Sequence, residues 1–201
     1  MITGLRPATF ENLQLNAGVF LEGFDPSTYE DAGALEDAIL NALEAGTGIL
    51  GATIGGGSFV AEPAIRQIEA DGMRYPIVGS TVNDMWTARL TGTLKEITPE
   101  NFKRVLITCD VDESKENVTV LTVRTDIEAT DYIPRLCWVG DTSKGFVLID
   151  LDNALNINGA SFTFTDRGEG TLPFDFQAHL SDLKEMDKAP FRIYFFDEAA
   201  A

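Results

Sequence analysis

The sequence predicts a mainly β protein: a β-sandwich of two packed antiparallel sheets, with one longer and one short α-helix. Three observations support this fold class. Apolar and polar residues alternate along several short stretches, β-branched residues are concentrated in others, and Gly, Pro, Asn and Asp separate these stretches as turn signals. Two stretches instead have the apolar spacing of a helix. At 201 residues the chain is long enough to form one domain with a substantial core.

The first part of the chain predicts an arm and then a helix. Residues 1–26 have one short apolar run and no regular pattern, so we expect an N-terminal arm there and a single β-rich domain over residues 27–201. Leu35, Ile39 and Leu43 recur at intervals of four, which predicts a helix over residues 29–45 that Gly46 ends.

A glycine-rich stretch, "GATIGGGSF" at residues 51–59, follows this helix. A phosphate-binding loop would need a strand before the glycines and a Gly-Lys-Ser/Thr sequence or a helix after them. Here a helix pattern precedes the glycines, and the residues after Gly57 resemble a strand with Pro63 in it. We therefore expect a flexible connection between the first helix and the first strand, in which glycine allows close backbone approach.

The middle of the chain predicts a hairpin, an amphipathic strand and the short helix. Asp71-Gly72 is a two-residue turn signal between strands expected at residues 65–70 and 73–78. Thr98 as N-cap and Pro99 at the first helical position predict a helix over residues 99–106. Between this hairpin and this helix, side chains alternate strictly between the two faces of an expected strand. One face is made of Trp86, Ala88, Leu90, Gly92 and Leu94.

Further strands are predicted in the second half of the chain. Residues 116–127 are rich in β-branched residues, and residues 137–140 and 145–151 flank a turn at 140–145. Residues 153–159 permit a brief helical turn. The last third predicts a hairpin of residues 160–165 and 172–179 around a turn at 166–170, and a final strand at residues 189–196.

The charge is strongly negative, because 32 Asp and Glu oppose 15 Lys and Arg, which gives a net charge of −17. Tight binding to nucleic-acid phosphates needs clustered basic residues, and here they are scattered singly. Ordinary DNA binding is therefore disfavoured. Two interpretations stay open: the charge lets DNA pass nearby without adhering, or it only keeps the protein soluble.

The sequence offers no pattern for nucleophilic catalysis or a metal centre. His179 is the sole histidine, and in the expected final hairpin it shares the polar face with Asp175 and Gln177, so we expect a surface histidine. Cys109 and Cys137 lie far apart and outside any cysteine motif, which predicts reduced, partly buried thiols and a cytosolic origin. The chain also lacks a signal-peptide core and a stretch of about 18 apolar residues, so neither export nor a membrane span is expected.

Carboxylate pairs are a weaker candidate for chemistry. Two acids at the right separation suffice for a glycosidase, but pairs occur by chance among 32 acids. The acidic segments at residues 110–116 and 126–131 lack the spacing of a calcium loop, and we expect solvated loops. Trp86 and Trp138 could stack on a sugar ring or a partner, but packing in the core is the better expectation for Trp86.

Five blocks of sequence together resemble one family. "LQLNAGVFL" (13–21), "LGATIGGGSFVAEPAIRQIEADGMR" (50–74), "GTLKEITPENFKRVL" (92–106), "DYIPRLCWVGD" (131–141) and "FTFTDRGEGTLPFDFQAH" (162–179) occur in order over nearly the whole chain. In combination they resemble the major tail, or tail tube, proteins of phages and prophages of Gram-positive bacteria.

The resemblance implies a structural virion protein without catalytic residues, cofactor or metal. Its two-sheet domain would assemble into hexameric rings, in which inner strands of six copies form a continuous barrel, and the rings would stack into the tube through which DNA is ejected. The implied partners are further copies, other tail proteins such as the tape measure and tail terminator, and DNA that passes without specific binding, but no membrane. The implied location is the virion tail, and the host cytoplasm during assembly.

Two expectations about residues follow from the resemblance. The glycine-rich stretch becomes a candidate inter-subunit loop that orders on assembly, formed by Gly51, Gly55, Gly56, Gly57, Ser58 and Phe59. Acids are expected to exceed bases on the inner surface of the tube, so that the DNA slides past. Alternatives are the inner tube of a contractile tail, tailocin or secretion system, a monomeric β-sandwich that decorates a capsid or binds a ligand, and a β-fold glycosidase.

Overall fold

The computed structural model describes residues 4, 6, 9 and 13–197. The protein is mainly β with two antiparallel sheets and two α-helices, which confirms the predicted fold class. The strands are β1 (Val19–Glu22), β2 (Thr53–Gln67), β3 (Thr81–Leu94), β4 (Cys109–Lys115), β5 (Val118–Val123), β6 (Ile133–Thr142), β7 (Gly145–Asn156), β8 (Leu172–Gln177) and β9 (Phe191–Asp197). The helices are α1 (Ala32–Ala45) and α2 (Pro99–Leu106), with 3-10 turns η2 (Pro26–Thr28), η3 (Ala129–Asp131) and η4 (Leu183–Glu185).

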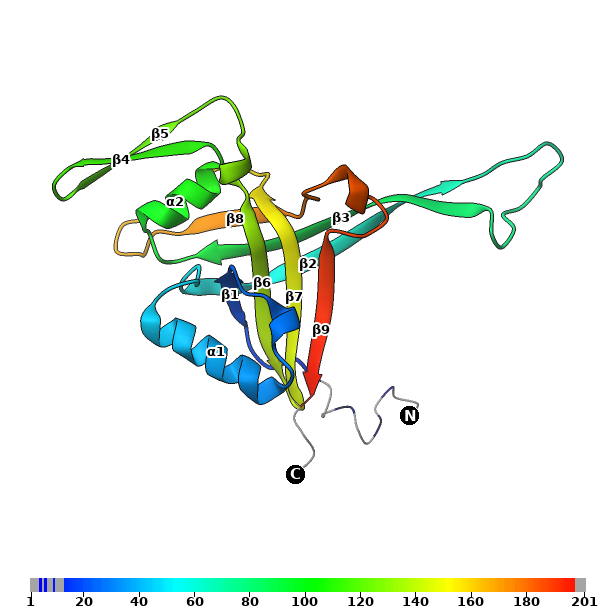
Figure 1. Cartoon of the computed structure of the whole chain (residues 1–201), viewed down its shortest axis with the longest axis horizontal. Helices are drawn as coiled ribbons and strands as arrows, with labels where there is room; N and C mark the ends of the chain where they lie inside the picture. Colours follow the sequence, from blue (N-terminus) through cyan, green and yellow to red (C-terminus); the bar gives the residue numbers. More distant parts are fainter. Residues whose placement is uncertain (1–3, 5, 7–8, 10–12, 198–201) are drawn as a thin grey trace.

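Seven strands form one sheet that folds over into two layers. The strand order is β1-β6-β7-β8-β3-β2, with β9 paired to β7, and β4 and β5 form a separate two-stranded sheet. Figure 1 shows the first layer, made of β1, β6, β7 and β9, crossing the second layer, made of β2, β3 and β8, at a steep angle. Crossed layers of this kind need a strand that passes from one layer to the other.

Strand β7 makes that passage. Its first part pairs with β6 and β9, and its end pairs with β8 through Leu155 and Asn156. The backbone turns at Asn153, whose φ of 43° is uncommon except in Gly, Asn and Asp. The buried Asn156 amide then donates to the carbonyl oxygen of Val105 over 2.7 Å, which fixes α2 against the bend. The helical turn predicted at residues 153–159 is therefore wrong.

The main core lies between the two layers. The predicted alternation of β3 is confirmed, since Ala88, Leu90 and Leu94 are buried. They meet Phe174 and Phe176 of β8, and the Phe174 ring packs edge-to-face on Phe20 of β1 with 5.1 Å between centroids. Each such side chain contributes about 1.5–3 kcal/mol when fully buried.

Helix α1 covers the outer face of the first layer. Leu35 and Ile39 pack on Leu21, Cys137 and Leu148, which form a second core cluster. The helix begins at Ala32 rather than at residue 29, because the Asp31 carboxylate caps it by accepting from the backbone N–H of Ala34 at 2.8 Å. It ends as predicted, with Gly46 in the left-handed conformation.

Helix α2 has the predicted bounds and the predicted cap. The Thr98 hydroxyl accepts from the backbone N–H of Asn101 at 3.2 Å, and Pro99 occupies the first turn. Inside the helix, the buried Asn101 amide donates to the carbonyl oxygens of Leu50 and Glu96. The helix therefore fixes the two segments that enter β2 and leave β3.

Two other expectations differ from the structure. Val19–Glu22 is strand β1, with Phe20 and Leu21 buried, so this part of the expected arm belongs to the fold, while much of residues 1–12 lies outside the described residues. Residues 160–165 do not form the first strand of the last hairpin. A single bridge joins Thr163 to Thr171, and Phe162 packs on Phe102 of α2 instead.

Candidate assembly surfaces

The glycine-rich stretch forms the start of strand β2. The expected flexible connection is wrong for residues 53–59, because Thr53 pairs with Leu94 and Gly57 pairs with Gly92. Between these pairs, residues 54–56 oppose only Thr93, and Gly55 and Gly56 have positive φ angles of 76° and 71°. The glycines therefore make a bulge in an edge strand. Before it, the Glu96 carboxylate accepts the backbone N–H of Ala52 at 2.7 Å, next to Gly51.

The next three residues of the stretch face both sides of the second layer. Ser58 points outward, where its hydroxyl lies 2.7 Å from that of Thr91. Phe59 points inward and its ring packs on Phe191 of β9, at 5.6 Å between centroids. Gly57 lies against the carbonyl of Thr91 and the ring of Phe20, so strands β1, β2 and β3 come close together at this residue.

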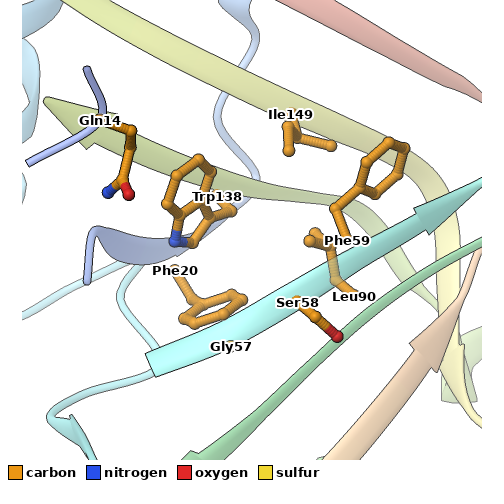
Figure 2. A pocket seen from close by; sticks show the side chains of 8 residues that line it. All are labelled: Gln14, Phe20, Gly57, Ser58, Phe59, Leu90, Trp138 and Ile149. Carbon is orange, nitrogen blue, oxygen red and sulfur yellow. The ribbon is translucent and has the colours of Figure 1, made fainter. Parts of the chain in front are cut away.

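An apolar cavity of about 200 Å³ lies where β2 crosses the first layer. Figure 2 shows Trp138 and Phe20 at one end and Phe59 and Ile149 at the other. No pattern in the sequence predicts this cavity. The residues that line it are Gln14, Phe20, Gly57, Ser58, Phe59, Leu90, Trp138 and Ile149.

The hairpin of β2 and β3 extends well beyond the layered core (Figure 1). Its closing turn contains Asp71-Gly72, but β2 ends at Gln67 and β3 begins at Thr81, so the predicted two-residue hairpin turn is wrong. Arg66 and Asp84 join the strands through a two-contact ion pair at 2.9 and 3.0 Å. Several apolar side chains of this arm are exposed: Ile65, Ile68, Tyr75, Ile77, Val78 and Met85.

In the seven-stranded sheet, two strands have an edge that pairs with nothing among the described residues. Strand β2 pairs only with β3, and β9 pairs only with β7. The free edge of β1 differs, because the carbonyl oxygen of Phe20 accepts the backbone N–H of Leu50 and Leu21 bridges Ile49. An open edge is a template for pairing with another chain. β2, with 15 residues, is the longest strand and offers the longest such edge.

The outer face of the second layer is polar and nearly balanced in charge. Over residues 57–62, 87–93 and 173–177 it presents the hydroxyls of Ser58, Thr87, Thr91 and Thr93. The charged residues in these ranges are Glu62, Arg89 and Asp175, and Arg89 lies 3.2 Å from Asp175. The acids thus exceed the bases by one on this face. Most of the net charge lies elsewhere on the chain.

The β4–β5 hairpin is a second projection, on the opposite side from the β2–β3 arm (Figure 1). The solvated loop expected at residues 110–116 is wrong, because these residues largely form β4. Both acidic segments meet at Arg124, whose guanidinium lies 2.8 Å from Asp110, 3.1 Å from Glu128 and 2.6 Å from Asp131.

The residues considered for catalysis or ligand binding make contacts within the fold. His179 is half-buried rather than on the surface; its ring packs on Tyr132, and its Nδ1 lies 3.3 Å from the carbonyl oxygen of Asn153. Cys109 and Cys137 are free and buried, and burial raises the pKa of both thiols. Trp86 is 40% exposed and contacts Phe191 edge-to-face, so it packs only in part. Among the described residues no group of three or more His, Cys, Asp and Glu is placed to hold a metal ion.

One buried carboxylate joins three strands of the first layer. Asp150 of β7 is fully buried, 3.4 Å from the Cys137 Sγ of β6 and 3.3 Å from the Arg192 guanidinium of β9. The Arg135 guanidinium lies 3.6 Å away and also pairs with Asp25. Burial raises the pKa of Asp150, although both arginines oppose this shift.

Comparison with known proteins adds no family. No protein-family model matches the sequence, and no curated protein matches it. None of the helices described is long and apolar enough to cross a membrane.

Proposed function

We propose that the protein is a structural subunit that self-assembles into hexameric rings, stacked as a phage tail tube that conducts DNA during ejection. The observation that carries the proposal is the β2–β3 arm, which combines the longest open edge of the fold with an exposed apolar tip. A monomer would leave both surfaces in water, and pairing with further copies would bury them. The family resemblance supports the same function.

The two surfaces suit a ring better than a two-fold dimer. The open edge of β2 and that of β9 belong to different strands in different layers. Contacts between unlike surfaces repeat from copy to copy, and they close into a ring or continue as a filament. The rings would stack through the projecting hairpins and meet the other tail proteins at the ends of the tube.

The polar face of the second layer is the proposed lining of the tube. Hydroxyl groups and one ion pair present few cations to a DNA backbone. Passing DNA would therefore gain little from phosphate contacts. The excess of one acid in the ranges given above has the expected sign, but the lining would be close to neutral rather than strongly acidic.

Light scattering after size exclusion tests the proposal. A species of six times the subunit mass that appears with rising concentration is the expected result.

The second candidate, a monomeric β-sandwich that decorates or binds, is favoured by the same apolar tip, because one foreign protein could cover it. That candidate predicts the subunit mass at every concentration. An inner tube of a contractile machine would assemble equally, and a neighbouring sheath gene would distinguish it.

A further inference from the structure

The β4–β5 hairpin belongs to neither layer of the fold. Among the described residues its two strands pair only with each other, and Figure 1 shows them beside α2, outside both layers. The pairing continues by one residue beyond the strands. The backbone N–H of Arg124 donates to the carbonyl oxygen of Thr108 at 3.1 Å, and the Thr108 hydroxyl donates to the carbonyl oxygen of Arg124 at 2.6 Å. Residues 108–124 therefore form one structural unit, called the hairpin unit.

The first connection of the hairpin unit to the rest of the chain is a strained turn. The backbone N–H of Thr108 donates to the carbonyl oxygen of Leu106 at 3.0 Å, which closes a three-residue turn around Ile107. Ile107 has a φ of 75° and a ψ of −70°, the conformation of the γ-turn with positive φ, which is rare and strained. For a β-branched residue this conformation is an outlier. Such strain persists only where the surrounding structure holds the residue in place.

The second connection has no regular structure. Residues 125–127 are exposed and belong to no helix or strand. Beside the first connection, a cavity of about 210 Å³ is lined by Ile107, Asp131 and Tyr132, among others. Backbone rotation at either connection therefore meets solvent or this cavity rather than the packed core.

Few contacts hold the hairpin unit in its observed orientation. Cys109 is buried, but the valines further along both strands are exposed: Val111, Val118, Val120 and Val123. Among the described residues, the shortest ion pair between the unit and the rest of the chain joins Arg124 to Asp131 at 2.6 Å. Asp131 lies in η3, shortly before β6, and its side chain is 2% exposed. The pair of Arg124 with the exposed Glu128 contributes less, because water screens it.

We propose that the hairpin unit rotates as one body about Ile107 and residues 125–127, and that the Arg124–Asp131 ion pair holds it in the observed orientation. A charge-assisted hydrogen bond to a buried carboxylate is among the stronger polar contacts of a protein, so its loss frees the unit. Release also relieves the strain at Ile107. The rotation reorients a projecting surface and leaves both layers unchanged. The proposal does not depend on assembly, because every group involved belongs to one copy.

The buried thiol of Cys109 reports the rotation, since it lies at the base of the hairpin unit. In the full chain at pH 8, Arg124→Gln is expected to speed the reaction of Cys109 with a thiol reagent at least about tenfold, the effect of losing one charge-assisted hydrogen bond. Cys137 lies in the second core cluster and should stay unreactive, which shows that the fold is intact. Arg66→Gln is the matched control, because it removes an ion pair with Asp84 from the other hairpin. Mass spectrometry of the labelled peptides follows each cysteine.

Two further variants test the ion pair from its other side and the strained turn. Asp131→Asn removes the ion pair and should accelerate the labelling of Cys109 as Arg124→Gln does, so it serves if Arg124→Gln folds poorly. In the Arg124→Gln background, Ile107→Gly is expected to slow this labelling about threefold, because glycine accepts the positive φ without strain. Asn117→Gly is the matched control, since Asn117 has a φ of 62° in the turn between β4 and β5, away from Ile107.

Amide hydrogen exchange distinguishes rotation from unfolding of the hairpin. The amides of β4 and β5 should keep their protection in Arg124→Gln, because the paired strands rotate intact. Unchanged labelling of Cys109 in both Arg124→Gln and Asp131→Asn, equal acceleration at Cys137, or loss of protection along β4 and β5 would each overturn the proposal.

Discussion

Gly57 of β2 lies directly opposite Gly92 of β3, and neither position has room for a Cβ atom. At Gly57 the added atom would overlap the carbonyl oxygen of Thr91, and at Gly92 it would lie 2.6 Å from the Phe174 ring. This glycine pair lets β2 and β3 lie close to each other and to the core at the point where β2 leaves its bulge.

Replacement of either glycine by alanine is expected to destabilise the protein. Gly57→Ala and Gly92→Ala should each lower the free energy of unfolding by about 1–3 kcal/mol, because overpacking forces backbone and side chains apart. Guanidinium unfolding measures the change. Gly33→Ala is the matched control, since that helical position is open and alanine favours a helix. Equal stability of all three variants would contradict the close packing.

The buried Asp150 predicts a pH dependence. Its pKa is raised in the folded protein, so the folded state binds the proton more tightly than the unfolded state does. The contribution of Asp150 to stability is therefore largest below its ordinary pKa of about 4, and it is lost as pH rises through the folded value. The stability of the wild type relative to Asp150→Asn should fall as pH increases from 4. Denaturant unfolding of both proteins at several pH values measures this, and a constant difference would show that the pKa is not raised.

The two thiols should be unreactive in the folded protein. Burial hides both sulfurs and raises their pKa, which suppresses the reactive thiolate. A thiol reagent at pH 8 is expected to label neither cysteine until denaturant is added, and then to label both. Mass spectrometry counts the adducts. Rapid labelling of Cys137 without denaturant would mean that the contact between α1 and the first layer opens readily.

The tip of the arm should contribute to assembly but not to folding. Tyr75 is 80% exposed and Val78 fully so, which means that their replacement by serine removes no buried contact within the subunit. The double variant Tyr75→Ser with Val78→Ser is expected to keep its melting temperature and to raise the concentration needed for assembly. Leu183→Ser is the matched control, because Leu183 is 82% exposed on η4. If the control and the tip variant assemble alike, the tip is not an interface.

Local signals predicted the elements that local interactions fix. The caps at Thr98 and Gly46 marked helix ends, and the alternation around Leu90 and Phe174 marked the buried face of the second layer. These features depend on residues a few positions apart.

Elements that depend on distant partners could not be predicted in this way. Strand β4 looks like a solvated loop because it pairs only with β5 and buries little beyond Cys109. Asn153 and Asn156 suggest a turn, but β8 and α2 hold that segment as a strand. The cavity needs residues from separate strands and the segment before β1, and no local pattern brings these together.

Negative-stain electron microscopy of the purified full chain over a concentration series tests the proposed function most directly. Self-assembly into a tail tube predicts rings, and at higher concentration hollow tubes of uniform diameter, whose formation the Tyr75→Ser and Val78→Ser changes impair. Single compact particles at every concentration, for both the wild type and the tip variant, would contradict self-assembly and favour the monomeric binding module.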